Sequence, residues 1–230
     1  AEAPQQRRTD FRAIDHTFDE ATVLREARRC MSCGGGAEVL VDKCTACLTC
    51  LRVCPFDIPD VTDVARIDSA LCQACGMCIA DCPGNAIIAR SWSVQELRDE
   101  TRAKLAANGH DVVAYICGHH APAASWTGAA PAAPRVAELY LPSMSRLSAA
   151  TVLHALRAGA RGVIVVACHS GADRYPHATQ RVTKRLEQVR ELLAEIGVRS
   201  DKVQLVTAAD QGREAMQEAM TQAAQKIRQS

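Results

Sequence analysis

Residues 111–230 alternate short apolar runs with longer amphipathic segments, and this pattern predicts strands and helices in turn. Four runs have the length of strands, at residues 111–117, 136–141, 162–168 and 203–206. The third run reads GVIVVAC, which is typical of a strand that is buried on both faces of a parallel sheet. Three segments repeat apolar residues at helical spacing, at residues 148–158, 179–196 and 210–227. We therefore expect an α/β parallel sheet of flavodoxin-like type with helices on both faces.

Residues 1–110 carry weaker patterns. Helix signals follow Asp19, where a helix is expected to run to Cys30, and Ser93, which forms a capping box with Glu96 and predicts a helix ending near Gly109. Short strands are expected at residues 38–41, 64–67 and 87–89. The expected divisions are an N-terminal helical segment, a small cysteine-rich domain, a linker helix and an α/β domain, at residues 1–36, 37–92, 93–110 and 111–230.

Eight cysteines form the strongest motif in the chain. They occur as two copies of C-x2-C-x2-C-x3-C-P, one starting at Cys44 and the other at Cys72. This is the spacing of bacterial ferredoxins with two [4Fe–4S] clusters, in which the fourth cysteine of each run binds the other cluster. We expect that fourth cysteine to begin a short helix leading away from its own run. The first cluster is then expected on Cys44, Cys47, Cys50 and Cys82, and the second on Cys72, Cys75, Cys78 and Cys54.

Residues 40–92 resemble a bacterial two-cluster ferredoxin domain, and Asn85-Ala86-Ile87 after the last Cys-Pro pair also fits that family. The resemblance implies an α+β ferredoxin-like fold. The alternative is a pair of structural zinc sites, because C-x2-C pairs also suit zinc. Zinc does not require two interleaved runs with prolines at the same position, so iron–sulfur clusters are favoured.

Composition narrows the classes of function. The chain has 27 basic and 26 acidic residues, which argues against binding to nucleic acid or a membrane surface through charge. Ten of its twelve cysteines fall between Cys30 and Cys82 at metal-binding spacings, without a signal peptide, so we expect a reducing cytoplasmic setting. No run of 18 apolar residues predicts a transmembrane helix. We find no catalytic triad, paired-carboxylate motif or Walker loop, so the chain is not expected to be catalytic alone.

The stretch 26–34 contains Cys30 and Cys33 and resembles the C-terminal tail of glutamate-synthase-small-subunit-like FAD/NAD(P)H oxidoreductases. The resemblance implies that a flavoprotein module lies beside this chain, as a partner or as a fused segment. Cys30 and Cys33 are expected to be a vestigial pair near the first cluster. The alternatives are a further site completed by Cys117, Cys168 or a partner, and a redox-active dithiol.

The second half is similar to the delta subunit of methyl-viologen-reducing hydrogenases over residues 111–209. The matching stretches are 115–117, 156–163, 167–171 and 192–198. That family links a hydrogenase or dehydrogenase to a heterodisulfide-reductase-like flavoprotein, and its domain holds a [2Fe–2S] cluster on four cysteines. Cys117 and Cys168 match two of these. By alignment, His120, Ser143 and Asp173 stand where the family has further cysteines.

We expect the C-terminal domain to have lost this cluster and to be a docking scaffold. The alternative is a [2Fe–2S] site on Cys117 and Cys168 with two histidines, His119 or His120 and His169, in the Rieske manner. Taken together, the sequence predicts an electron-transfer subunit that joins a flavin or NAD(P)H module to a catalytic oxidoreductase subunit in a hetero-oligomer. The second hypothesis is the C-terminal part of an NAD(P)H-dependent FAD oxidoreductase, and the third is a zinc interaction protein.

Overall fold

The computed structural model divides the chain into two units, residues 1–30 and 31–230. It describes residues 17–27, 35–90, 93–107, 109–119, 135–169, 171–208 and 212–229. In the first unit, helix α1 (Glu20–Ala27) begins after Asp19, whose carboxylate accepts a 2.8 Å hydrogen bond from the Thr22 backbone N–H. This is the N-cap arrangement that satisfies one of the unpaired donors of the first helical turn.

Residues 37–89 contain a strand–helix–strand set twice, with one additional 3-10 turn in the first copy. The first set is β1 (Ala37–Val39), η3 (Val41–Lys43), α2 (Thr49–Val53) and β2 (Asp60–Val61), and the second is β3 (Ala65–Arg66), α3 (Met77–Asp81) and β4 (Ile87–Ala89). Strand β1 pairs antiparallel with β4, and β2 pairs antiparallel with β3. Each half therefore completes its sheets with a strand from the other half, so the two halves are intertwined.

The backbone repeats as closely as the cysteines do. Left-handed φ values occur at Ala46, Leu48 and Asp57, and again at the equivalent positions of the second half, Ala74, Gly76 and Asn85. Non-glycine residues adopt this conformation rarely, so three matched pairs indicate that both halves bend the chain in the same way. The sequence alone did not reveal this feature.

One expectation about these loops is wrong. The fourth cysteine of each run does not begin a helix, because α2 and α3 end just before Cys54 and Cys82. Both cysteines have extended backbone, with ψ of 118° and 114°. Each precedes a proline, whose ring disfavours helical geometry at the residue before it. The helices instead contain the third cysteines, Cys50 and Cys78.

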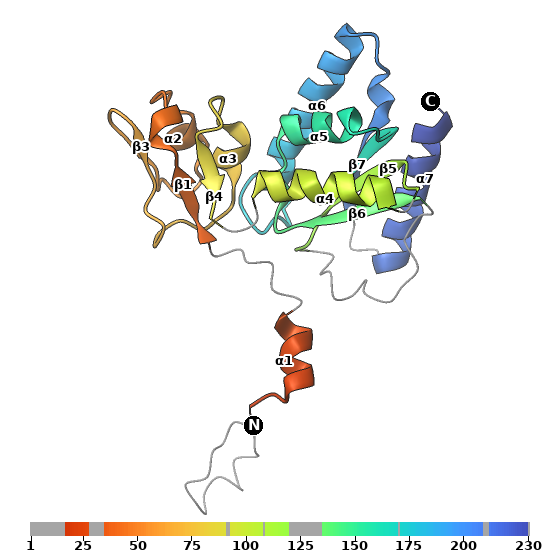
Figure 1. Cartoon of the computed structure of the whole chain (residues 1–230), viewed down its shortest axis with the longest axis horizontal. Helices are drawn as coiled ribbons and strands as arrows, with labels where there is room; N and C mark the ends of the chain where they lie inside the picture. Colours follow the sequence, from red (N-terminus) through yellow and green to blue (C-terminus); the bar gives the residue numbers. More distant parts are fainter. Residues whose placement is uncertain are drawn as a thin grey trace, which may run out of the picture. The chain divides into compact units, whose positions relative to one another are not determined.

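The C-terminal region is built on a four-stranded parallel sheet in the order β6-β5-β7-β8, which confirms the predicted parallel sheet (Figure 1). Its strands are β5 (Val112–Cys117), β6 (Val136–Leu141), β7 (Gly162–Cys168) and β8 (Val203–Ala208). Its helices are α4 (Val94–Ala107), η5 (Met144–Arg146), α5 (Ala149–Arg157), α6 (Ala178–Glu195), η6 (Ser200–Lys202) and α7 (Gly212–Gln229). Strands β5 and β7 are central, and every residue of both is buried.

Helices cover both faces of this sheet, as predicted. One face packs Tyr115 and Val165 against the apolar residues of α4, α5 and α6, and the other packs Ile116 and Ile164 against α7. Helix α4, which the sequence suggested as a linker, packs on the first face through Leu97 and through a 3.0 Å hydrogen bond between the Thr101 and Tyr115 hydroxyls. None of the helices in the described part of the chain has the length and apolar character needed to span a bilayer.

Asp111 holds helix α7 against the sheet through an ion pair with Arg228. Its buried carboxylate accepts hydrogen bonds of 3.0 to 3.3 Å from the Arg228 guanidinium. Burial alone raises the pKa of Asp111, but Arg228, with help from Arg135, outweighs burial and holds that pKa below 3.8. The ion pair therefore contributes stability above about pH 4, and this contribution is lost as pH falls through the lowered pKa.

An Asp111→Asn variant is expected to unfold about 2–3 kcal/mol more easily at pH 7, because it removes the charge of the buried carboxylate that pairs with Arg228. The free energy of unfolding is measured anaerobically by denaturant titration. The difference in the free energy of unfolding between the variant and the wild type should narrow below about pH 4, where the wild-type carboxyl becomes protonated and loses its charge. Asp201→Asn is the control, because Asp201 pairs with the exposed Arg199. Equal losses in both variants would contradict the role assigned to Asp111.

Candidate metal centres

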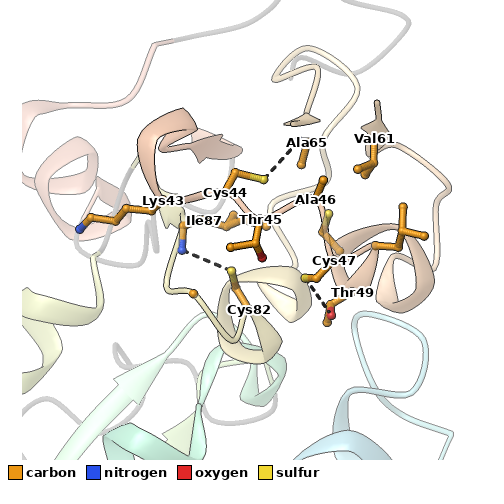
Figure 2. Close-up of a pocket in the computed structure, with 14 residues that line it drawn as sticks. Lys43, Cys44, Thr45, Ala46, Cys47, Thr49, Val61, Ala65, Cys82 and Ile87 are labelled. Carbon is orange, nitrogen blue, oxygen red and sulfur yellow. Dashed lines mark hydrogen bonds between the residues drawn. The ribbon is translucent and has the colours of Figure 1, made fainter. Parts of the chain in front are cut away.

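Four of the eight cysteines line one cavity, although they come from both halves of the repeat. Cys44, Cys47, Cys50 and Cys82 line the same pocket, and we call this group the first site. Figure 2 shows Cys44, Cys47 and Cys82 with their sulfur atoms turned toward this space, while the Lys43 side chain extends away from it. The rest of the lining is mainly apolar and includes Val61, Ala65 and Ile87.

Backbone amides support the sulfur atoms of the first site. The N–H of Ala65 donates to Cys44 Sγ and the N–H of Ala86 donates to Cys82 Sγ, each at 3.3 Å (Figure 2). Cys47 Sγ lies 3.3 Å from the Thr49 hydroxyl, and this contact lowers the pKa of the Cys47 thiol. Hydrogen bonds of this kind stabilise a thiolate and tune the potential of any iron that it binds.

The other four cysteines line a second cavity. Cys54, Cys72, Cys75 and Cys78 form this second site, with Phe56, Ile58 and Ile67 in its wall. Burial raises the pKa of Cys50 in the first site and of Cys75 and Cys78 in the second. Thiols held this way carry their protons until a metal displaces them.

The two sites differ in what covers them. Cys47 is exposed, whereas Cys75, its counterpart in the second run, is only 7% exposed. Leu48 lies 37% exposed beside the first site, and its counterpart Gly76 is buried. The first site therefore faces outward and the second faces the interior of residues 31–230.

Segment η5 of the C-terminal region covers the second site. Arg146 donates from Nε and Nη2 to the Ala74 carbonyl, at 3.2 and 2.6 Å, and Ser145 donates its hydroxyl to the Cys75 carbonyl. A Cβ atom on Gly76 would overlap the side-chain carbons of Arg146. Glycine at residue 76 thus allows the guanidinium to lie against the cysteine loop.

Helix α6 also contacts the two segments that meet at the second site, η5 and α3. Arg185 donates from Nε to Asp81 at 2.7 Å, and from Nη1 to the carbonyls of Ser145 and Leu147 at 2.9 and 3.2 Å. Asp81, the last residue of α3, also accepts from Arg181. Tyr175 packs edge-on against Phe56, with ring centroids 6.4 Å apart, and joins the apolar cluster around Cys75 and Met77. The second site is therefore fixed to the α/β region by ionic, polar and apolar contacts.

The remaining described cysteines meet at the carboxyl end of the parallel sheet. Cys117 ends β5 and Cys168 ends the neighbouring strand β7, and both are buried. Their sulfur atoms are 3.4 Å apart, with Cys168 donating to Cys117. This hydrogen bond and burial raise the pKa of the Cys168 thiol.

Other residues singled out in the sequence do not join a common site. Cys30, Cys33 and His120 lie outside the described residues. His119 is exposed, and Ser143 is buried with its hydroxyl hydrogen-bonded to that of Ser145. Asp173 accepts a hydrogen bond from the Thr179 hydroxyl. Within the described ranges, no three Cys, His, Asp or Glu side chains converge closely enough to hold one metal ion.

Sequence reasoning missed the residues that cover the second site. Arg146, Arg185 and Asp81 belong to no motif and lie far apart along the chain. One signal was present, because the repeat places leucine at residue 48 and glycine at residue 76. A glycine at only one of two equivalent loop positions is what a close neighbour at that loop requires.

Two sequence families account for most of the chain. The family described as methyl-viologen-reducing hydrogenase, delta subunit, matches residues 112–230. The family described as 4Fe-4S dicluster domain matches residues 37–83. Together they cover the α/β region and both cysteine runs.

Two curated proteins that are similar to this chain carry the names of oxidoreductase subunits. The chain is 30% identical over 171 residues to the A subunit of ferredoxin:CoB-CoM heterodisulfide reductase from Methanosarcina mazei, a match to 71% of this chain and 21% of the relative. It is 32% identical over 72 residues to the iron-sulfur D subunit of F420-non-reducing hydrogenase from Archaeoglobus profundus, a match to 31% of this chain and 53% of the relative. The chain thus spans about a fifth and about half of the lengths of these relatives.

Proposed function

The chain belongs to the family of the methyl-viologen-reducing hydrogenase delta subunit, and from this premise we propose that it carries electrons between subunits of an oxidoreductase complex. Two [4Fe–4S] clusters are the proposed carriers, one in each cysteine site. Each cluster, when bound, takes up or releases one electron. Cys44, Cys47, Cys50 and Cys82 would hold the first, and Cys54, Cys72, Cys75 and Cys78 the second.

The observation that carries this proposal is the grouping of the sulfurs. Each cavity is lined by four thiols, three from one run and the fourth from the other. A cubane needs four thiolates around a space far larger than one ion, in a largely apolar shell that limits contact with water. Zinc draws its four ligands within about 2.3 Å of one ion, and no three Cys, His, Asp or Glu side chains of the described residues converge closely enough for that.

The different coverings of the sites suggest separate roles. The first site is proposed to exchange electrons with a partner, because its loop is exposed and carries the exposed side chains of Val41, Leu48 and Leu51. The second site, covered by η5 and α6, is proposed to connect the first to the α/β region. The intertwined strands keep the two sites at a fixed separation.

The proposed partners are a flavoprotein module with FAD and NAD(P)H, or one of heterodisulfide-reductase type, and a catalytic oxidoreductase subunit. Support comes from relatives whose names are those of subunits of a heterodisulfide reductase and of a hydrogenase. The tail around Cys30 and Cys33 supports the flavoprotein in particular. A second candidate is that such a module precedes this segment in one polypeptide, which the 21% coverage of the first relative favours.

Transfer to a flavin tests the proposal. The holoprotein is photoreduced anaerobically, excess reductant is removed, and the protein is mixed with an oxidised ferredoxin–NADP⁺ reductase as the FAD probe. Two one-electron carriers should reduce about one FAD per chain, with recovery of the visible cluster absorption. Rapid flavin reduction supports electron transfer. A reduced protein that keeps its electrons, while a known two-cluster ferredoxin discharges under the same conditions, would overturn it.

Arg146 is expected to raise the potential of the second cluster. Its buried guanidinium lies against the Ala74–Cys75 segment, and a nearby positive charge favours added negative charge. An Arg146→Met variant should shift that potential down by roughly tens of millivolts, as follows from ~1–2 kcal/mol of charge interaction. Potentiometric EPR measures the shift. Arg146→Lys keeps the charge and is expected to shift less, and equal shifts in both variants would assign the effect to packing.

A further inference from the structure

Cys117 and Cys168 form a pair that the two-site scheme does not use. The sulfur atoms face each other at 3.4 Å from the ends of adjacent parallel strands. A disulfide bond requires about 2.05 Å, so the two sulfur atoms would have to approach by about 1.3 Å for the bond to close. Both residues are buried, at 5% and 1% exposure, which favours reaction with each other over reaction with an outside thiol.

The pair occupies a special position in the sheet. In the order β6-β5-β7-β8, the chain leaves β5 toward one edge and returns to β7 on the other side. Open α/β sheets place their reactive groups outside the carboxyl ends of the strands at such a reversal. Cys117 and Cys168 are the last residues of these two strands.

A short series of contacts joins the pair to the second site. Cys75 packs with Tyr175 and Ala178 in one apolar cluster. The residue after Ala178 is Thr179, whose hydroxyl donates a 3.0 Å hydrogen bond to the Cys168 carbonyl. These contacts therefore connect the pair to Cys75, one of the four thiols of the second site.

We propose that Cys117 and Cys168 form a reversible disulfide that exchanges two electrons with the [4Fe–4S] clusters. Oxidation would form one S–S bond between Cys117 and Cys168 and release two protons and two electrons, and bound clusters in their oxidised form would supply the acceptors, one electron each. Reduction by two reduced clusters runs the same steps in reverse. This proposal rests on the proposed function, since the clusters are the electron carriers that it names.

Polar groups and an open hollow lie beside the backbone of Cys168. Asp173 accepts a hydrogen bond from the Thr179 hydroxyl, the group that also contacts the Cys168 carbonyl. Asp173 and Thr179 line an open hollow with Gly171 and His177 at the start of α6.

Trapping of thiols tests the pair directly. The anaerobic holoprotein is divided into a dye-oxidised and a deazaflavin-photoreduced sample, and both are denatured in excess N-ethylmaleimide and digested. Mass spectrometry should find the Cys117 and Cys168 peptides joined in the oxidised sample and both alkylated in the reduced one. Alkylation of both cysteines in the oxidised sample would overturn the proposal. So would about ten irons per chain, because the two thiolates would then hold a [2Fe–2S] cluster.

Two variants separate this proposal from the proposed function. Cys168→Ser should lose the joined peptide but keep both clusters and flavin reduction. In Cys75→Ala the disulfide should still open with dithiothreitol once the protein is denatured, but no longer by photoreduction of the folded protein. Equal opening by photoreduction in that variant would show that the pair takes electrons by another route, which would contradict the exchange with the clusters.

Discussion

A Cys75→Ala variant is expected to bind about four irons per chain instead of about eight, and to lose electron transfer through the second site. Cys75 is one of four thiols around that cavity and lies buried under η5. No other described cysteine lines the cavity beyond Cys54, Cys72 and Cys78, so a replacement ligand is not at hand. Iron analysis and EPR of the reduced protein measure the loss, and flavin reduction measures its consequence.

Two further variants make this prediction specific. Cys54→Ala should damage the second cluster and spare the first, although Cys54 belongs to the first run. Conversion of the second cluster to a three-iron form would also count as damage to it, since the iron that lost its thiolate is the one released. Cys168→Ala is the control for a buried cysteine outside both sites. Electron transfer at the wild-type rate in Cys75→Ala would contradict the assigned role of the second site.

A Gly76→Ala variant is expected to lose most of its second cluster while keeping the first. The added methyl group would overlap the side chain of Arg146, which is itself held by two hydrogen bonds to Ala74. Overlap in a packed interior costs about 1–3 kcal/mol, and the positive φ of residue 76 adds backbone strain. The loop that carries Cys75 should shift, and the EPR signal of the second cluster should fall.

The cause of this effect can be isolated. Gly109→Ala places alanine at a similar φ of +61° where no atom lies within 4 Å of the new Cβ, so it tests strain alone. A Gly76→Ala, Arg146→Ala double variant removes the atoms that clash and should restore much of the signal. Failure of the double variant to recover, with an intact Gly109→Ala protein, would show that the contact with Arg146 is not the cause.

Strands and helices of the C-terminal region were predictable because their patterns are long and regular. The run at 162–168 is β7 as predicted, and the helix at 179–196 differs from α6 by one residue at each end. The face of that helix with Val182, Leu186, Val189 and Leu193 is buried, as its spacing indicates. In these elements the apolar periodicity matches the buried face, so the local sequence is sufficient to predict the element and the side that it buries.

The small elements around the cysteines were harder to predict. Strand β2 has only two residues, and α2 and α3 have five each, which is too short for a periodic signal. Cysteine spacing predicted which four cysteines come together in each cavity, but not how the loops bend, and it suggested the wrong place for the short helices. The prolines after Cys54 and Cys82 contained the missing information, because they disfavour helical geometry at those cysteines.

The covering of the second site depends on contacts between residues about 70 to 100 positions apart, such as Arg146 with Ala74 and Arg185 with Asp81. Nothing local in the sequence encodes such pairs. The same holds for Cys117 and Cys168, which are 51 residues apart and meet only because β5 and β7 are neighbours. The sequence showed that both lie at strand ends, but the strand order brings them together.

The most direct test of the account is anaerobic iron and acid-labile sulfide analysis with EPR of the reduced protein. We expect about eight irons and eight sulfides per chain and the spectrum of two interacting [4Fe–4S] clusters. Two zinc ions without sulfide, in a colourless protein that gives no EPR signal after reduction, would contradict the central claim that this chain transfers electrons.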